Sequence, residues 1–221
     1  MEMLKKLKFY SAKYGFVHAV SSYIGRYNFQ LWQLIGPLVT KKYMSEWLKK
    51  TVNANRILNL GGGGNCIDGC LTVDISPRAD VYVDLMTQLP FEDSSFDAIF
   101  CEEAIEHIPL NQAEDLLKEC LRILKEGGVL RISTPDLNYF AEQVLHETGA
   151  CNAINQIFYE HTHRYIYTRQ ALQEKCLEAG FENVRSSSYK DSNSRLGYLD
   201  SHADRFSHPP EISQYLEAEK T

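Results

Sequence analysis

The chain has 221 residues, of which 44% are hydrophobic, and a formal net charge of −6. This length suits one core with an appendage, and the sequence holds no apolar run of about 18 residues that could cross a membrane. Residues 1–50 contain nine Lys and Arg residues and two acidic residues. Residues 51–221 contain fourteen Lys and Arg residues and twenty-seven acidic residues. The acidic main body argues against a broad nucleic-acid footprint, while the basic, aromatic N-terminal part could meet an anionic partner or a membrane surface.

Apolar residues recur at three- and four-residue steps through residues 3–36, which predicts helices. Gly15, Gly25 and the pair Gly36-Pro37 are expected to divide this region, and a further helix is expected over about 38–51. We expect residues 1–52 to form a helical extension and residues 53–221 to form the main domain. The extension either packs on that domain or acts as a lid over its active site.

From Arg56 onward, short apolar strands alternate with helices. This alternation predicts an α/β fold with a mainly parallel sheet that is covered on both faces. The last helix is expected to begin at the capping residue Thr168 and to end at Gly180. Residues 190–210 are expected to form a long surface loop. Strands are expected at 56–60, 71–74, 81–84, 96–101, 129–134, 184–189 and 212–219, with helices at 111–124, 135–147 and 168–179.

Four consecutive glycines, residues 61–64, follow the apolar run at 57–60. Glycines leave the backbone bare, so several N–H groups can approach one small polar or anionic ligand. Asp74 and Asp84 end the next two apolar runs. A strand, a glycine turn and acids at the following strand ends are the layout of a nucleoside-binding α/β sheet. Residues 65–70 are too few for the usual helix of about ten residues before the second strand, so we expect a turn there.

Other ligand classes are disfavoured. A dinucleotide fingerprint needs a glycine at position 66 or 67, and a kinase-type loop needs Lys followed by Ser/Thr; neither is present. Cys66-x-x-x-Cys70 lacks a second metal-type pair, so no metal is expected. The six cysteines are spread along the chain and are interpreted as free, mostly buried thiols, which favours a reducing, cytoplasmic setting.

Five segments, in order, resemble class I S-adenosylmethionine-dependent methyltransferases of the type 11 group. They are residues 57–63, 89–99, 106–108, 121–128 and 135–136. Residues 163–181 are also similar to a bacterial-type subgroup linked to glycan and surface-polysaccharide synthesis. The resemblance covers roughly residues 55–221 and implies a Rossmann-like sheet of seven strands, the last antiparallel. Two positions depart from the family pattern, since Asn59 replaces an acid and Asn65 replaces a third glycine.

The resemblance implies a site for S-adenosylmethionine, which leaves as S-adenosylhomocysteine. Asp74 would accept hydrogen bonds from both ribose hydroxyls, and Asp84 would accept one from the adenine amino group, with the Leu85 N–H facing the ring. The glycine loop would approach the amino-acid end. The cofactor-binding candidates are Asn59, Gly61, Gly62, Gly63, Asp74, Ile75, Asp84, Leu85, Cys101 and Glu102.

Methyl transfer to a hydroxyl benefits from a general base. His107 follows the fourth expected strand and titrates near neutrality, so it is the first candidate, although it could instead cap or pack the start of a helix. Glu106 or Glu103 could orient it. Asp136, at the end of the fifth strand, and His163 are further catalytic candidates.

The segment at 161–165 is the other dense cluster of polar residues. His161 and His163 lie two apart, so in an extended loop they point the same way and could bind a metal or a hydroxylated substrate, or simply pack. Arg164 could hold an anionic group, and Tyr165 completes the candidate substrate-binding set.

We therefore expect an S-adenosylmethionine-dependent O-methyltransferase, with a sugar hydroxyl of a glycan or glycolipid as the first choice of acceptor. That choice depends on fold-level analogy and on the aromatic N-terminal part. A small metabolite or a protein is an alternative acceptor, and a non-catalytic interaction protein with this fold is an alternative from another class. No Asn/Asp-Pro-Pro-aromatic stretch follows the fourth strand, which disfavours methylation of nucleic-acid amino groups.

Overall fold

The computed structural model describes residues 2–146 and 152–221. The chain divides into two compact units, residues 1–85 and residues 86–221. Cys151 lies outside the described residues, as does residue 147, the expected end of one helix. None of the helices in the described part of the chain is long and apolar enough to span a bilayer.

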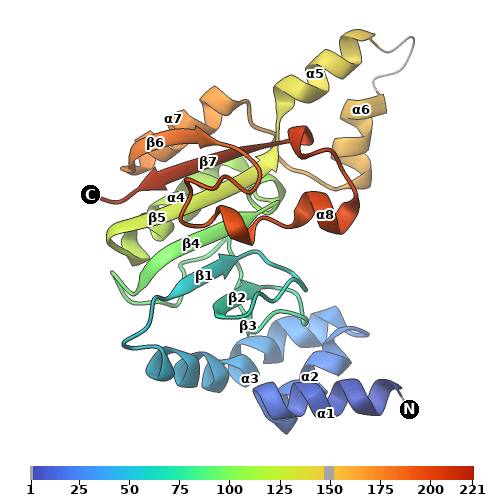
Figure 1. Ribbon diagram of the computed structural model, residues 1–221. Helices are drawn as coiled ribbons and strands as arrows, with labels where there is room; N and C mark the ends of the chain where they lie inside the picture. The colour runs from blue at the N-terminus through green and yellow to red at the C-terminus, as the bar shows by residue number, and fades with distance from the viewer. Residues whose placement is uncertain (1, 147–151) are drawn as a thin grey trace. The chain divides into compact units, whose positions relative to one another are not determined.

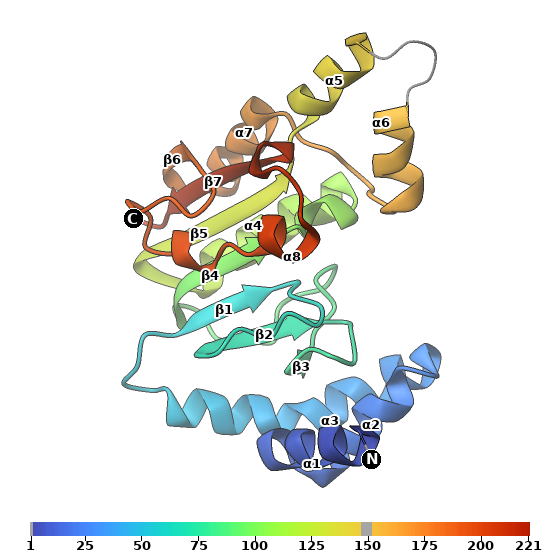
Figure 2. The same ribbon diagram turned by 45° about the vertical axis from the view of Figure 1, so that its right-hand side comes forward.

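The first unit combines three helices with three parallel strands (Figure 1). Its strand order is β3-β2-β1. Figure 2 shows α3 running alongside these strands; α2 packs against α3, and α1 packs against α2. The elements are α1 (Glu2–Tyr14), α2 (Phe16–Gly25), α3 (Phe29–Lys50), β1 (Ile57–Leu60), β2 (Cys70–Asp74) and β3 (Val81–Tyr82).

The helix α3 runs through Gly36-Pro37, so the expected break at this pair is wrong. Pro37 cannot donate a backbone hydrogen bond, but tertiary contacts hold the helix. Gly36 lies against Tyr82, since a Cβ at position 36 would come within 2.8 Å of that ring. The Thr40 hydroxyl donates to the Gly36 carbonyl (2.8 Å) and accepts from the Tyr82 N–H (3.1 Å), which ties the helix to β3.

Buried polar contacts attach the N-terminal helices to the strands of the first unit. Asp80 is buried and accepts hydrogen bonds from Lys13 (3.0 Å), Tyr14 (2.6 Å) and the Thr72 N–H (3.0 Å). The fully buried Trp32 donates its indole N–H to the Ile75 carbonyl (2.9 Å). These contacts support the packed arrangement of the helices, and the domain boundary at residues 52–53 stays a prediction.

The second unit holds four strands in the order β4-β5-β7-β6. The strand β4 is parallel to β5, while β7 is antiparallel to both β5 and β6. The helices α4 and α7 pack together and contact β5 and β6, on the face opposite α8 (Figure 1). The elements are β4 (Phe96–Glu102), α4 (Leu110–Ile123), β5 (Leu124–Pro135), α5 (Leu137–His146), α6 (Asn152–Asn155), α7 (Arg169–Ala179), β6 (Glu182–Ser187), α8 (His202–Phe206) and β7 (Ser213–Glu219).

The expected fold class is confirmed. The described residues form seven strands, with parallel pairs at β1–β2, β2–β3 and β4–β5 and an antiparallel last strand. Thr168 caps α7 through the Ala171 N–H (3.1 Å), and Gly180 ends it at a φ of +103°. Both are the residue types that these positions prefer.

Residues 190–210 are more ordered than the surface loop that the sequence predicts, because they contain α8. The segment is anchored on the fully buried Arg131, whose guanidinium donates to both carboxylate oxygens of Asp200 (2.8 and 2.5 Å) and to Glu217 (3.1 Å). A buried arginine needs such carboxylate partners, so this segment is part of the packed body of the second unit.

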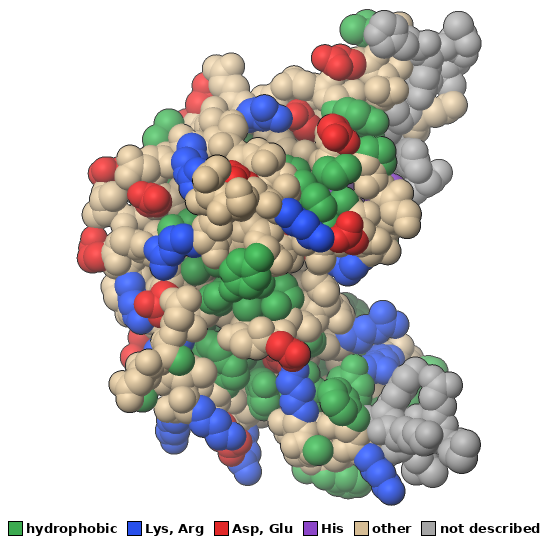
Figure 3. Space-filling view, viewed as in Figure 1, with side chains coloured by type: hydrophobic (Ala, Val, Ile, Leu, Met, Phe, Trp, Pro, Cys, Tyr) green, Lys and Arg blue, Asp and Glu red, His purple; other side chains and the backbone are tan. Residues whose placement is uncertain are grey.

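Large apolar side chains remain exposed on the N-terminal helices, for example Phe16 (67%) and Leu38 (75%). The Lys and Arg side chains of this region are scattered on the face shown in Figure 3 and form no single patch there. The expected contact with an anionic surface therefore stays a prediction.

Candidate functional site

The glycine turn lies in the first unit, directly after β1. Gly61 (φ +71°) and Gly63 (φ +57°) adopt left-handed conformations that favour glycine. Gly62 is required by packing, since a Cβ there would come within 2.4 Å of the Asn59 amide. Open space faces Gly63. No helix forms between β1 and β2 among the described residues, which confirms the turn expected over residues 65–70.

Asn59 supports this turn from inside the unit. Its side chain is buried, and its amide donates to the Asn65 carbonyl (2.8 Å) and to the Thr72 hydroxyl (3.1 Å). Both amide hydrogens are thus used within the protein. Asn59 therefore supports the glycine turn. Its predicted contact with a ligand could be made only through its oxygen atoms, which accept hydrogen bonds.

Asp74 stands at the end of β2 beside the glycine turn. One carboxylate oxygen accepts from the Gly63 N–H (3.1 Å) and the other accepts from the Ser76 N–H (2.6 Å). A carboxylate offers about four acceptor positions and can accept from more than one donor at a time. It is partly exposed, as are Asp84 and Leu85 after β3, and Ile75 is 36% exposed. A bare turn with the partly exposed Asp74 beside it fits the ribose hydroxyls and the amino-acid end of an adenosyl ligand.

The other two predicted cofactor residues, Cys101 and Glu102, end β4 in the second unit and are buried. Burial raises the pKa of the Cys101 thiol well above its ordinary range. Burial alone would also raise the pKa of Glu102, but hydrogen bonds from His202, Ser201 and Arg205 lower it to about 2. The carboxylate therefore anchors the start of α8, through the Ser201 N–H at 2.6 Å and Arg205 at 2.6 Å.

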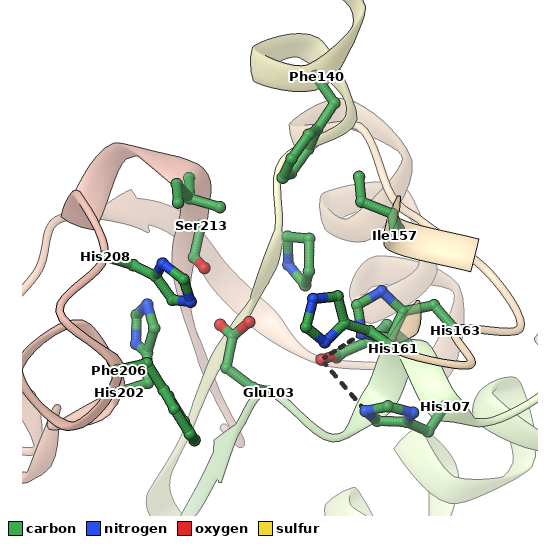
Figure 4. A pocket seen from close by; sticks show the side chains of 13 residues that line it. Glu103, His107, Phe140, Ile157, His161, His163, His202, Phe206, His208 and Ser213 are labelled. Carbon is green, nitrogen blue, oxygen red and sulfur yellow. Dashed lines mark ion pairs between the residues drawn. The ribbon is translucent and has the colours of Figure 1, made fainter. Parts of the chain in front are cut away.

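A cavity of about 420 Å³ opens in the second unit, near the carboxyl ends of β4 and β5. Five of the seven histidines of the chain line it. Figure 4 shows imidazoles and the Glu103 carboxylate pointing into the cavity below Phe140 and Ile157. The lining residues are Glu103, Glu106, His107, Pro135, Phe140, Ile157, His161, His163, His202, Phe206, His208, Ile212 and Ser213.

One wall of the cavity is polar and consists of Glu106, His107, His161 and His163, with Glu106 close to both His107 and His163. Glu106 is fully buried in the 3₁₀ helix Ile105–His107, and its Oε2 accepts from the Thr134 hydroxyl (2.9 Å). Its Oε1 has no hydrogen-bond partner and lies 3.9 Å from His107 Nε2 and 4.0 Å from His163 Nε2. Burial, followed by the charge of Glu103, raises the pKa of Glu106 well above its ordinary range.

Three histidine rings lie in contact in this wall. The rings of His107 and His163 are 4.7 Å apart in an edge-to-face arrangement, and those of His161 and His163 stack at 5.7 Å. Burial, and then the charges of His107 and His161, lowers the pKa of His163 to about 4, so this imidazole is neutral at pH 7. The His107 side chain is 43% exposed and is accessible from solvent. The structure thus brings together three of the residues predicted from the sequence.

The remaining predicted residues lie outside the cavity lining. Asp136 directly precedes α5, where it accepts from the Asn138 N–H (3.0 Å) and pairs with Arg169 (3.3 Å). The Arg164 side chain is exposed. The Tyr165 ring packs against that of the buried Tyr167 at 4.7 Å. Their predicted catalytic and substrate-binding roles stay predictions.

The sequence interpretation missed part of the cavity. His202 and His208 come from the segment predicted as a loop, and Glu103 was considered only as a residue that orients His107. Glu103 has a left-handed φ of +51°, a conformation that is uncommon outside glycine, and burial raises the pKa of its carboxyl. The spacing of Glu103, Glu106 and His107 was the available signal, since residues three apart share a side of a helical turn.

Comparisons with known proteins point to a methyltransferase domain. Residues 68–132 match the methyltransferase domain family. A probable S-adenosylmethionine-dependent methyltransferase of Mycobacterium tuberculosis is 37% identical over 108 residues, which are 49% of this chain and 35% of that protein. A probable S-adenosylmethionine-dependent methyltransferase of Mycolicibacterium smegmatis is 38% identical over 60 residues, 27% of this chain and 23% of that protein. The chain therefore matches about a third or less of the length of these curated relatives.

Solved structures show the same fold at low sequence identity. A SAM-dependent methyltransferase from Archaeoglobus fulgidus has a TM-score of 0.53 at 16% identity, covering 83% of this chain and 93% of that one. A possible histamine N-methyltransferase from Thermotoga maritima has a TM-score of 0.52 at 18% identity, covering 86% of this chain and 100% of that one. Residues 68–132 therefore match a methyltransferase domain, and the chain has the fold of solved S-adenosylmethionine-dependent methyltransferases.

Proposed function

We propose that this chain transfers a methyl group from S-adenosylmethionine to a hydroxyl oxygen of an acceptor that binds in the histidine-lined cavity. The observation that carries the proposal is the cavity of about 420 Å³ whose wall holds five imidazoles and two carboxyl groups. It accompanies a methyltransferase domain match over residues 68–132 and a bare glycine turn that contacts Asp74 at the end of β2.

The donor is held by the first unit in this proposal. Asp74 would take the ribose hydroxyls, Asp84 the adenine amino group, and residues 61–63 the amino-acid end. The donor supplies a methyl group on a sulfonium, and its transfer to oxygen forms a C–O bond, breaks a C–S bond and releases the hydroxyl proton. The sulfonium is already activated, so the protein mainly positions the acceptor and accepts that proton.

His107 is the first candidate for the group that takes the proton. Its imidazole is accessible at the cavity wall and lies 3.9 Å from the Glu106 carboxyl. Histidine is the side chain that most often acts as a general acid or base in enzymes. His163, with its pKa lowered to about 4, suits a different task, because a neutral imidazole can accept a hydrogen bond from an acceptor hydroxyl.

A sugar hydroxyl of a glycan or glycolipid is the preferred acceptor. The cavity combines hydrogen-bonding imidazoles with the rings of Phe140 and Phe206, and sugars offer both hydroxyls and flat apolar faces. The exposed Arg164 is available for an anionic substituent such as a phosphate or a carboxylate. A small metabolite or a protein side chain is the second choice of acceptor, and a non-catalytic interaction role is the third possibility.

A cytoplasmic location belongs to the same proposal. The described cysteines are all free thiols, and four of the five are buried. Cysteines in oxidising compartments are commonly paired, whereas cytosolic ones stay reduced.

The proposal is tested by incubating the chain with trideuteromethyl-labelled S-adenosylmethionine and a panel of saccharides, small hydroxylated metabolites and proteins. Mass spectrometry should find one labelled methyl group on the oxygen of a saccharide. A labelled methyl group on a small metabolite or on a protein instead would identify that class of molecule as the acceptor. No label on any acceptor, together with no heat of binding for S-adenosylhomocysteine, would favour the non-catalytic role.

A further inference from the structure

Glu106, His107 and His163 present three metal-type ligand atoms at one point of the cavity wall. Their Oε1 and ring nitrogens all lie within 4.8 Å of one another, and the two pairs that involve Oε1 are 3.9 and 4.0 Å apart. Atoms that bind one Zn²⁺ at about 2.0–2.2 Å lie roughly 3–4 Å from each other. A small rotation of the half-exposed His107 ring would bring the set into that range. We infer that these three residues form a binding site for a divalent transition-metal ion.

The environment of Glu106 supports a cation at this point. Its Oε1 is buried, has no hydrogen-bond partner and lies within 4.0 Å of the Nε2 atoms of both imidazoles. Among the described residues, no Lys or Arg pairs with Glu106 or with the neighbouring Glu103, whose Oε1 also lacks a partner. A buried carboxylate oxygen without a partner is costly, and a bound cation would satisfy it.

The three ligands are held in place without the ion. Thr134 on β5 donates to Glu106 Oε2 (2.9 Å), which orients the carboxyl so that Oε1 faces the imidazoles. The Arg164 and Tyr165 N–H groups both donate to the Glu106 carbonyl (2.7 and 3.1 Å), which fixes the segment that carries His163. Such supporting contacts orient the ligands of metal sites and raise affinity.

The ligand set indicates the kind of ion. Two imidazoles and one carboxylate are typical of Zn²⁺ sites with three protein ligands, which leave a coordination position open. The open position would face the cavity. With the ion bound, His107 and His163 would be its ligands and would not act directly on the acceptor. An acceptor hydroxyl in the open position would instead ionise more easily on the ion, so methyl transfer would depend on the ion. That consequence rests on the proposed function, whereas the metal site itself does not.

The test is a titration of untagged, chelator-treated protein with Zn²⁺ by calorimetry, with Co²⁺ absorption as a second readout. We expect one saturable site per chain with a ligand-field spectrum of imidazole and oxygen ligands. His107→Ala and His163→Ala should each weaken binding at least about tenfold, since even supporting residues contribute 10–100-fold. His208→Ala is the matched control, because it removes another imidazole from the same cavity and should leave the affinity unchanged.

Two results would overturn the inference. One is the absence of saturable binding by the unmodified protein. The other is equal affinity in His107→Ala, His163→Ala and the His208→Ala control, which would place the ion elsewhere. These measurements use no methyl donor, so a failure of the proposed methylation would leave their outcome intact. Conversely, if metal-free protein methylated its acceptor at the full rate, the proposed function would stand. Only the role of the ion in methyl transfer would be contradicted.

Discussion

Glu106 Oε1 lies 4.0 Å from His163 Nε2, although the two residues come from segments far apart in the chain. The link is made by the backbone, since the N–H groups of Arg164 and Tyr165 both donate to the Glu106 carbonyl. The polar wall of the cavity is therefore assembled from the turn after β4 and from the segment that leads to α7. Its chemistry depends on this junction.

Replacing Asp74 by alanine should abolish tight binding of the methyl donor. The change removes a carboxylate that would accept two ribose hydroxyls, and hydrogen bonds to charged groups contribute about 1.5–3 kcal/mol each. We expect the affinity for S-adenosylhomocysteine to fall roughly a hundredfold or more, measured by calorimetry. Asp74→Asn keeps one oxygen and should bind with intermediate affinity. Unchanged affinity in Asp74→Ala would remove this residue from the donor site.

Replacing His107 by alanine should slow turnover without affecting donor binding. Loss of a general base costs typically 10²–10⁴-fold in rate. The affinity for S-adenosylhomocysteine should stay the same, because His107 is not among the residues proposed to hold the donor. Single-turnover rates with labelled donor are the measurement. A rate equal to that of the unmodified protein would withdraw His107 as a catalytic residue.

The Glu102 carboxylate should make stability depend on pH. Its pKa is lowered from an ordinary value of 4.5 to about 2, so it stabilises the fold above the ordinary value and loses this contribution as pH falls towards 2. At about 1.4 kcal/mol per pKa unit, the contribution is about 3 kcal/mol. Urea unfolding at pH 7 should show Glu102→Gln to be less stable by a similar amount. The difference from the unmodified protein should narrow below about pH 4, and a constant difference would show that the carboxylate charge is not the cause.

Gly62→Ala should destabilise the protein. Its Cβ would lie 2.4 Å from Asn59 Nδ2 and 2.7 Å from Thr72 Cγ2, both held inside the first unit, and overpacking of this kind costs about 1–3 kcal/mol. Gly64→Ala is the matched control, since its Cβ would meet only the flexible Arg78 side chain at 3.0 Å. Thermal unfolding of both variants is the measurement. Equal stability of the two would show that the turn relaxes around the added methyl group.

Local signals were enough to predict most elements. The turn after β1 followed from consecutive glycines, and the bounds of α7 followed from Thr168 and Gly180, because each residue acts on its own stretch of backbone. The differences between the predicted and the observed elements result from long-range contacts. Continuity of α3 depends on Gly36 packing against Tyr82, and α8 depends on its anchors at Glu102.

The candidate site was predictable in part for the same reason. His107, His161 and His163 were found because chemically distinctive residues cluster in short segments. The buried, unpartnered oxygen of Glu106 was not predictable, because it results from tertiary burial. His202 comes to the cavity only because α8 packs on β4 through Glu102.

The central claim is that a glycine turn and the acid at the end of β2 hold an adenosyl methyl donor. A crystal structure of the full chain grown with S-adenosylhomocysteine tests it most directly. We expect both ribose hydroxyls within hydrogen-bonding distance of the Asp74 carboxylate and the amino-acid end against residues 61–63. An empty turn at saturating ligand, or a ribose placed away from Asp74, would contradict the account.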